Sequence, residues 1–267
     1  MPPILNRSAF DVTLSRRSLL GVAGATVASL VAAPARATGD SSRFTFGILR
    51  YGSPAWNPRP NALSRLLREV ETTTSIPVAE DPIEVAPTLE SLIAAPLVVW
   101  SGDRGFAPLD EASRRALQTW LRAGGTLLVD SAEGRDEGEF EASIRRELAA
   151  ILPDVAVPRI PSEHVLFKSF YLVDGSPGRV GVSPNVYGAE FEGRMAVILS
   201  PNDLMGAWAR DALGNPQYDV YPGGERQREM AFRFGVNIVM YALCTDYKDD
   251  QVHVPFILRR RRWRVSE

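Results

Sequence analysis

Three aspartates of this chain each follow an apolar run that is typical of a buried strand. They are Asp103, Asp130 and Asp203. If the runs are parallel strands, their carboxyl ends share one edge of a sheet, and the three carboxylates converge there. Such a group could hold a divalent cation through oxygen ligands, or serve as an acid–base pair on a polar substrate. The alternative is that each aspartate caps the helix after its strand.

A nucleophile is the second kind of chemistry considered. Ser131 directly follows an apolar run, and His164 comes later in the chain, which is the order that such a pair requires. A nucleophile elbow needs small residues two positions before and after, but Val129 and Glu133 occupy those positions. Cys244 lies in the last apolar run, so the elbow cysteine of an amidotransferase is missing. We therefore expect no glutaminase activity, and Ser131 and His164 remain a candidate pair.

Cofactor and metal signals are weak. The chain has two histidines and a single cysteine, which argues against a zinc site of the usual type. It has neither a dinucleotide glycine fingerprint nor a phosphate loop, so no motif requires a cofactor and the cofactor stays unknown. Cys244 cannot form an internal disulfide. Its apolar surroundings predict a buried, inert thiol.

A proline-stiffened loop at residues 51–60 carries the side chains best suited to hold a ligand. Trp56 could stack on a sugar or another flat ligand, with Asn57 and Arg59 beside it. The structural alternative is that Trp56 covers the edge of the sheet. The candidate ligand-binding residues are Tyr51, Ser53, Trp56, Asn57, Arg59 and Asn202.

Strand and helix signals alternate along the chain, as in a mostly parallel sheet covered on both faces. The pattern predicts an α/β fold in which the loops after the strands meet at one ligand-binding edge. Residues 155–193 carry four prolines and read as an irregular insertion. Strands are expected at 44–50, 96–101, 126–130 and 195–200, with a less regular one near 77–85, and helices at 61–70, 110–121, 140–152 and 225–243.

The first 37 residues resemble a twin-arginine signal peptide. Arg16 and Arg17 precede two leucines and an apolar stretch that is too short for a membrane span, which needs about 20 strongly apolar residues. Ala35-Arg36-Ala37 then fits an A-x-A cleavage site. We expect export to the periplasm with cleavage after Ala37, a single domain over residues 38–250, and a basic tail over residues 251–267.

The charge is distributed unevenly. Without the signal peptide the chain holds 26 basic and 31 acidic residues, a net charge of −5 that gives no reason to expect a nucleic-acid partner. Residues 38–258 alone have a net charge of −9. The tail suits an anionic membrane surface or an acidic envelope protein, unless it folds back onto the acidic body. Its five arginines are Arg259, Arg260, Arg261, Arg262 and Arg264.

Five stretches resemble a bacterial family catalogued as domain of unknown function 4159. The resemblance implies a fold like the class I glutamine amidotransferases, which is a flavodoxin-like three-layer sandwich, and a setting in the bacterial envelope. It implies no reaction. The stretches are YGSPAWNPRP at 51–60, GGTLLVD at 124–130, HVLFKSFY at 164–171, Asn202-Asp203, and GVNIVMYAL at 235–243.

Together these features favour a non-catalytic domain that binds a ligand or partner at the periplasmic face of the inner membrane. The alternative is an envelope hydrolase acting on a carbohydrate or an amide. It would use the three aspartates together with Ser131 or His164. Nothing in the sequence determines the oligomeric state.

Export gives the first testable prediction. Replacing Arg16 and Arg17 by lysine should trap an uncleaved precursor in the cytoplasm, because the translocase recognises the arginine pair. Intact mass of the exported protein should show a chain that begins at Thr38. Unchanged export from a strain without the twin-arginine translocase would contradict the predicted route.

Overall fold

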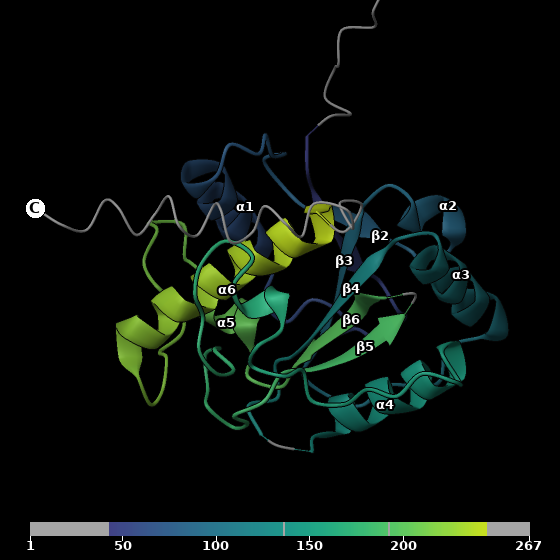
Figure 1. Ribbon diagram of the computed structural model, residues 1–267. Coiled ribbons are helices and arrows are strands. Elements are labelled where there is room, and N and C mark those ends of the chain that lie inside the picture. The colour runs from purple at the N-terminus through teal and green to yellow at the C-terminus, as the bar shows by residue number, and fades with distance from the viewer. Residues whose placement is uncertain (1–42, 136, 192, 245–267) are drawn as a thin grey trace, which may run out of the picture. The chain divides into compact units, whose positions relative to one another are not determined.

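One six-stranded sheet forms the centre of the computed structural model, which describes residues 43–135, 137–191 and 193–244. The strand order is β2-β1-β3-β4-β6-β5, and all strands except β5 are parallel (Figure 1). The expected signal peptide and basic tail lie outside the described residues. The strands are β1 (Phe46–Leu49), β2 (Ile83–Val85), β3 (Leu97–Gly102), β4 (Thr126–Ser131), β5 (Tyr187–Phe191) and β6 (Arg194–Ser200).

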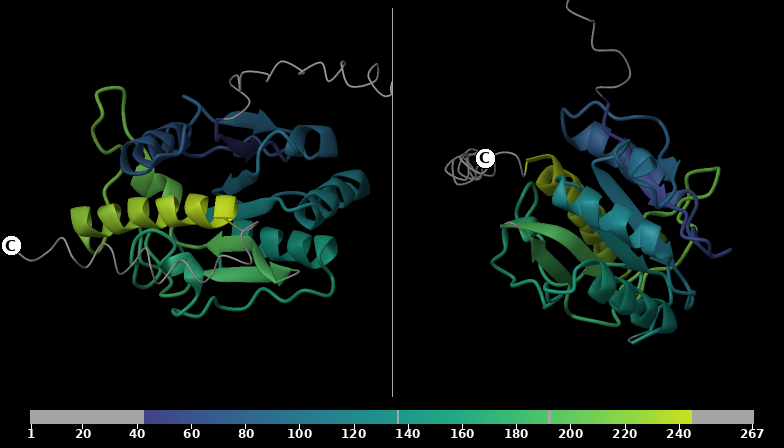
Figure 2. Two further views of the ribbon diagram at one scale, coloured as in Figure 1. Left: turned by 45° about the horizontal axis from the view of Figure 1, so that its top comes forward. Right: turned by 90° about the vertical axis from the view of Figure 1, so that its right-hand side faces the viewer.

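Helices cover both faces of the sheet, so the predicted flavodoxin-like three-layer sandwich is confirmed (Figures 1 and 2). Three of them pack together on one face: α1 (Ala62–Thr73), α5 (Leu204–Trp208) and α6 (Gly224–Cys244). The other face is covered by α2 (Leu89–Leu92), α3 (Glu111–Arg122) and α4 (Glu139–Ile151). Each face therefore has its own hydrophobic core.

The central strands are buried along their whole length because helices cover both of their faces. Every residue of β3 and β4 is buried, which agrees with their continuous apolar sequences. The two strands pair in register, with Ser101 opposite Asp130. The polar residues that follow them therefore emerge side by side at the carboxyl edge.

The strand order places a topological switch between β1 and β3. The chain runs from β1 outward to β2, then returns past β1 to form β3 and the strands beyond it. The loops after β1 and β3 consequently diverge. In open α/β sheets, ligands bind in the crevice that this divergence leaves.

Side-chain hydrogen bonds explain where α3 begins and how one loop of the irregular segment is held. Asp110 caps α3, because its carboxylate accepts a hydrogen bond from the N–H of Ser113 at 2.7 Å. Within the irregular segment 155–193, a 3-10 turn named η2 (Val165–Phe167) is followed by loop. Asn237 of α6 fixes that loop, since its side chain accepts from the backbone of Phe170 and of Tyr171.

The prediction that Cys244 is buried is wrong. Cys244 is the last residue of α6, and its side chain is exposed. Leu243 before it is exposed as well, so the described part of the protein does not cover this last turn of α6. Local desolvation still raises the pKa of the thiol, as expected of an unreactive cysteine. In the part of the chain that the structure describes, no helix is both long and apolar enough to cross a membrane.

Candidate functional site

The carboxyl edge of the sheet brings together loops from four parallel strands. The segment after β1 leads into the proline-rich loop. Asp130 lies at the end of β4, and the segments after β3 and β6 carry Asp103 and Asp203. The structure unites two of the aspartates, Asp130 and Asp203, and leaves Asp103 apart from them.

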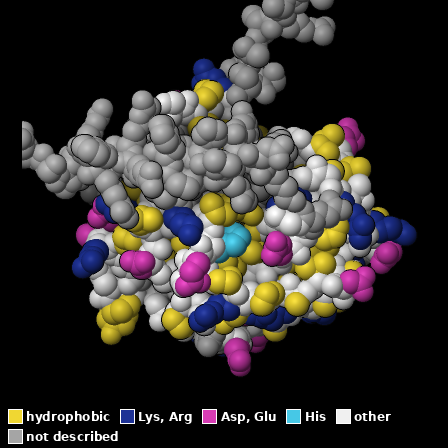
Figure 3. All heavy atoms as spheres, viewed as in Figure 1, with side chains coloured by type: hydrophobic (Ala, Val, Ile, Leu, Met, Phe, Trp, Pro, Cys, Tyr) yellow, Lys and Arg dark blue, Asp and Glu magenta, His cyan; other side chains and the backbone are white. Residues whose placement is uncertain are grey.

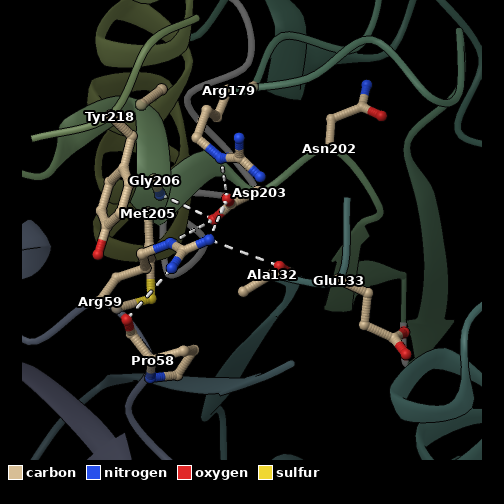
Figure 4. Close-up of polar contacts among 12 residues, drawn as sticks. Pro58, Arg59, Ala132, Glu133, Arg179, Asn202, Asp203, Met205, Gly206 and Tyr218 are labelled. Atoms are coloured by element: carbon tan, nitrogen blue, oxygen red, sulfur yellow. Dashed lines mark hydrogen bonds and ion pairs between the residues drawn. The ribbon is translucent and has the colours of Figure 1, made fainter. Parts of the chain in front are cut away.

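Of the three aspartates, Asp203 accepts the most hydrogen bonds. Its carboxylate is fully buried and binds the guanidinium of Arg59 through two hydrogen bonds, Nε to Oδ1 at 3.2 Å and Nη2 to Oδ2 at 2.7 Å (Figure 4). Arg179 donates to Oδ2 from the opposite side through its Nε. The N–H of Gly206 donates to Oδ1 at 2.9 Å, so Asp203 also caps α5. The capping alternative is therefore correct for this aspartate.

The backbone of Asp203 has a left-handed conformation, with φ 54° and ψ 62°. Few residues other than glycine adopt this conformation, although aspartate does so more readily than most. The turn also needs Gly206, because a Cβ atom at that position would lie 2.4 Å from Oδ2 of Asp203. The turn from β6 to α5 therefore directs the carboxylate of Asp203 into the protein.

Asp130 lies fully buried beside this turn. Its Oδ1 accepts from the N–H of Leu204 at 2.8 Å, and its Oδ2 accepts from the N–H of Met205 at 2.9 Å. Burial, followed by the nearby charge of Asp203, raises the pKa of Asp130 to about 7. Asp130 therefore holds the start of α5, which follows a different strand from its own.

The side chain of Asn202 holds a neighbouring loop in place through hydrogen bonds. Its side-chain oxygen accepts from the backbone of Val182 and of Ser183, and its amide group donates to the carbonyls of Ser176 and Ser183. The side chain is fully buried. Asn202, predicted to bind a ligand, instead fixes the loop that carries Arg179.

Ser131 and His164 do not form a pair. The Ser131 hydroxyl donates to the carboxylate of Glu133 at 3.3 Å, and Ser131 is almost completely buried. His164 precedes η2, where its Nδ1 accepts from the N–H of Leu166 at 3.1 Å. Burial lowers the pKa of His164. Among the residues that the structure describes, no hydrogen bond joins Ser131 to His164.

Asp103 lies at the end of β3 and is partly exposed. Arg104 binds its carboxylate through Nε at 2.8 Å and Nη2 at 3.2 Å. The hydrogen bond from Arg104 lowers the pKa of Asp103, so the group is an ionised, paired carboxylate. It has no contact with Asp130 or Asp203.

Aromatic side chains fill the space beneath the ends of β1 and β3. Tyr51 is buried among Trp100, Phe106 and Phe140, with ring centroids 4.7–6.3 Å from its own. Its hydroxyl donates to the carbonyl of Ser101 at 3.0 Å, and burial raises the pKa of Tyr51 to about 12. Tyr51 is thus a core residue, and Trp100 lies in the core as its apolar strand predicts.

The loop after β1 borders a hollow at the topological switch. Its volume is about 320 Å³, and its lining residues are Arg50, Gly52, Ser53, Pro54 and Trp56. The guanidinium of Arg50 stands 5.4 Å from the ring centroid of Trp56, which also packs against the core. Beside it, the side-chain oxygen of Asn57 is buried without a hydrogen-bond partner among the described residues. Of the six residues predicted to bind a ligand, only Ser53 and Trp56 line this hollow.

Sequence reasoning missed Arg179, Tyr218 and the structural role of Glu133. Arg179 lies in the irregular segment, and Tyr218 stacks on Arg59 at 4.3 Å. Glu133 accepts from the N–H of Glu141 at 3.3 Å and so takes the place of a cap for α4. None of the three occurs in a recognisable motif. The composition offered one general signal for arginine–carboxylate pairs. Lys168 and Lys248 are the only lysines among the 30 basic residues, so the others are arginines, which bind carboxylates bidentately.

The part of the chain that the structure describes contains no cluster of three or more His, Cys, Asp and Glu side chains able to hold a metal ion. Asp130 and Asp203 are the only two candidate carboxylates that lie together, and backbone N–H groups and arginines already occupy their oxygens. The site therefore consists of two buried carboxylates under a partly exposed layer of arginine and aromatic side chains.

The fold defines a flavodoxin-like α/β domain whose topological switch lies between β1 and β3. The family model described as domain of unknown function DUF4159 matches residues 45–243, and the chain belongs to that family. The match includes all six strands of the sheet. No curated protein matches the chain in sequence.

The raised pKa of Asp130 predicts how stability depends on pH. An acid that keeps its proton longer in the folded state stabilises the fold at low pH, and this contribution falls by up to roughly 1.4 kcal/mol per pH unit as pH rises toward about 7. Asp130→Asn stays uncharged and loses one acceptor, so it should be less stable than wild type in acid. The difference in the free energy of unfolding should then shrink toward pH 7.

Denaturant unfolding of the two proteins between about pH 5 and pH 8 measures this difference. His164 has a lowered pKa and acts in the opposite direction, but it is present in both proteins and cancels. Parallel stability curves for wild type and Asp130→Asn would show that Asp130 does not change its ionisation in this range.

Proposed function

We propose that the chain is an exported, non-catalytic binding domain at the periplasmic face of the inner membrane. One observation carries this proposal. The groups that could perform catalysis at the carboxyl edge are engaged in structural hydrogen bonds, while an arginine and a tryptophan border an open hollow at the same edge.

The arrangement of the carboxylates argues against the hydrolase alternative. A general acid or base must come within hydrogen-bond reach of its substrate, directly or through one water. Asp130 and Asp203 are fully buried, and the oxygens of each accept hydrogen bonds from the protein. A substrate could reach either one only after α5 or the arginines had moved.

The hollow favours a ring-bearing ligand that carries an acidic group, such as an oligosaccharide of uronic acids. Its volume of about 320 Å³ lies at the lower end of the roughly 300–1,000 Å³ typical of ligand pockets. Trp56 offers an aromatic ring. Arg50 offers a guanidinium whose side chain is 60% exposed; its Nη1 pairs with Glu84 at 3.2 Å, so a ligand carboxylate would compete with this exposed ion pair. Exposed loop residues on a rigid sheet are where binding groups usually occur.

Binding of a galacturonate trimer, measured by calorimetry, tests this function. We expect Arg50→Gln to weaken binding at least about tenfold, corresponding to the loss of one charge-assisted hydrogen bond. Arg122→Gln is the matched control, because Arg122 stacks on Phe191 at a similar distance of 5.2 Å on another part of the protein. A wild-type protein that binds neither this trimer nor a neutral N-acetylglucosamine trimer would refute the proposal, and so would release of shortened products.

The basic tail supplies the proposed contact with the membrane. The body has a net charge of −9, but on the uncovered part of the face in Figure 3 acidic and basic side chains are interspersed. That face offers no single acidic patch to receive five arginines. We propose an anionic surface outside the molecule as the partner for the tail, which lies beyond the described residues.

Replacing the five tail arginines by serine should abolish flotation with vesicles of phosphatidylcholine and phosphatidylglycerol. Binding should also fall with added salt, since the Debye length is about 8 Å at physiological ionic strength. The melting temperature should stay nearly unchanged. A variant with five exposed body arginines replaced by serine is the charge-matched control: Arg68, Arg104, Arg115, Arg122 and Arg226. A tail variant that melts many degrees lower would mean that the tail packs on its own domain.

A further inference from the structure

Arg179 is fixed at one end of its guanidinium and open at the other. Its Nε donates to the carboxylate of Asp203. Its backbone N–H donates to the carbonyl of Asp203 at 3.0 Å, and its own carbonyl accepts from Tyr221 at 2.9 Å. Asn202 holds the rest of the loop through its buried side chain. The position of the guanidinium is therefore determined by the fold.

The terminal nitrogens of Arg179 make no hydrogen bond to the described residues. The one side-chain hydrogen bond of Arg179 there uses Nε, and 23% of the side chain is exposed. Gly134 faces Nη2 from the loop after β4, where a Cβ atom would stand only 3.2 Å from that nitrogen. Gly134 also has a φ of +70°, so both its backbone and this space favour glycine.

The charges around Arg179 do not balance. Arg59 and Arg179 share the single carboxylate of Asp203, and burial raises the pKa of the neighbouring Asp130, which reduces the negative charge beside them. Glu133 does not balance the second arginine. Figure 4 shows its carboxylate turned away from Arg179, and that carboxylate binds Ser131 instead.

We propose that Arg179 forms an oxyanion-binding site at the carboxyl edge, supported by Arg59, in which Nη1 and Nη2 donate to two oxygens of a carboxylate or a phosphate. An arginine that is already oriented loses little entropy when its fork closes on such a group. The site deepens the proposed function and rests on it, because it adds to Arg50 a second arginine through which this edge holds an acidic group of its ligand.

Titrations with inorganic phosphate and, separately, with acetate test the site without any sugar. Amide chemical shifts of the whole exported chain should change in a saturable way at Gly134 and near Arg179, beyond the changes caused by chloride at equal ionic strength. Arg179→Gln should weaken binding at least about tenfold, and Arg179→Lys should weaken it as well, because lysine keeps the charge but lacks the fork. The stronger of the two anions identifies the acidic group.

Arg114→Gln is the matched control. Arg114 also has 23% of its side chain exposed and also binds a fully buried carboxylate, that of Glu147, but its Nε and Nη2 both serve that pair. Anion binding should survive this change. Shifts in wild type that do not saturate, or that fall away from Gly134 and Arg179, would overturn the oxyanion site even if Arg179→Gln fails to fold. Because sugar binding at Trp56 is measured separately, failure of one proposal leaves the other distinguishable.

Discussion

A single carboxylate, that of Asp203, joins the segments that make up the functional edge. It binds Arg59 from the loop after β1, Arg179 from the irregular segment and the first turn of α5. Removing one partner from a buried ion pair costs about 3–5 kcal/mol, because the remaining charge is left without compensation in a medium that solvates it poorly. Loss of Asp203 would leave Arg59 and Arg179 without their shared carboxylate, at a smaller cost for each, because both side chains are partly exposed. The loops of the edge are therefore coupled to one another through this residue, although up to 144 positions separate their sequences.

Asp130 explains why such a carboxylate can lie so deep. The N–H groups of Leu204 and Met205 would have no intrahelical partner at the start of a helix, and Asp130 supplies acceptors for both. Because the pKa of Asp130 is raised, a proton can remain on this group, and the repulsion between Asp130 and Asp203 is then smaller. The two aspartates thus act as one structural unit, in which one ion-pairs with arginines and the other anchors α5.

The sequence was sufficient to predict the parallel centre of the sheet, because β3 and β4 are continuous apolar runs of strand length, but it did not locate β5, which lies within the irregular segment 155–193. It was also sufficient to place Asp130 and Asp203 at one edge. It could not indicate that Arg179 meets Asp203, since that contact depends on how an irregular loop closes. Helix α5 has five residues, too few for a periodic signal. The exposure of Cys244 depends on where neighbouring elements end, which the pattern along a single helix does not contain.

The division of roles at this edge follows from burial. Asp130, Asn202 and Asp203 are fully buried and fix loops, whereas Arg59 and Arg179 keep 14% and 23% of their side chains exposed. A buried polar group that is fully hydrogen-bonded rigidifies its surroundings, but it has no remaining capacity for a substrate. Partly exposed arginines that are oriented by such groups keep donors available. In this domain the acidic residues that first suggested catalysis therefore position basic residues, and recognition of an anion is the chemistry that this arrangement supports.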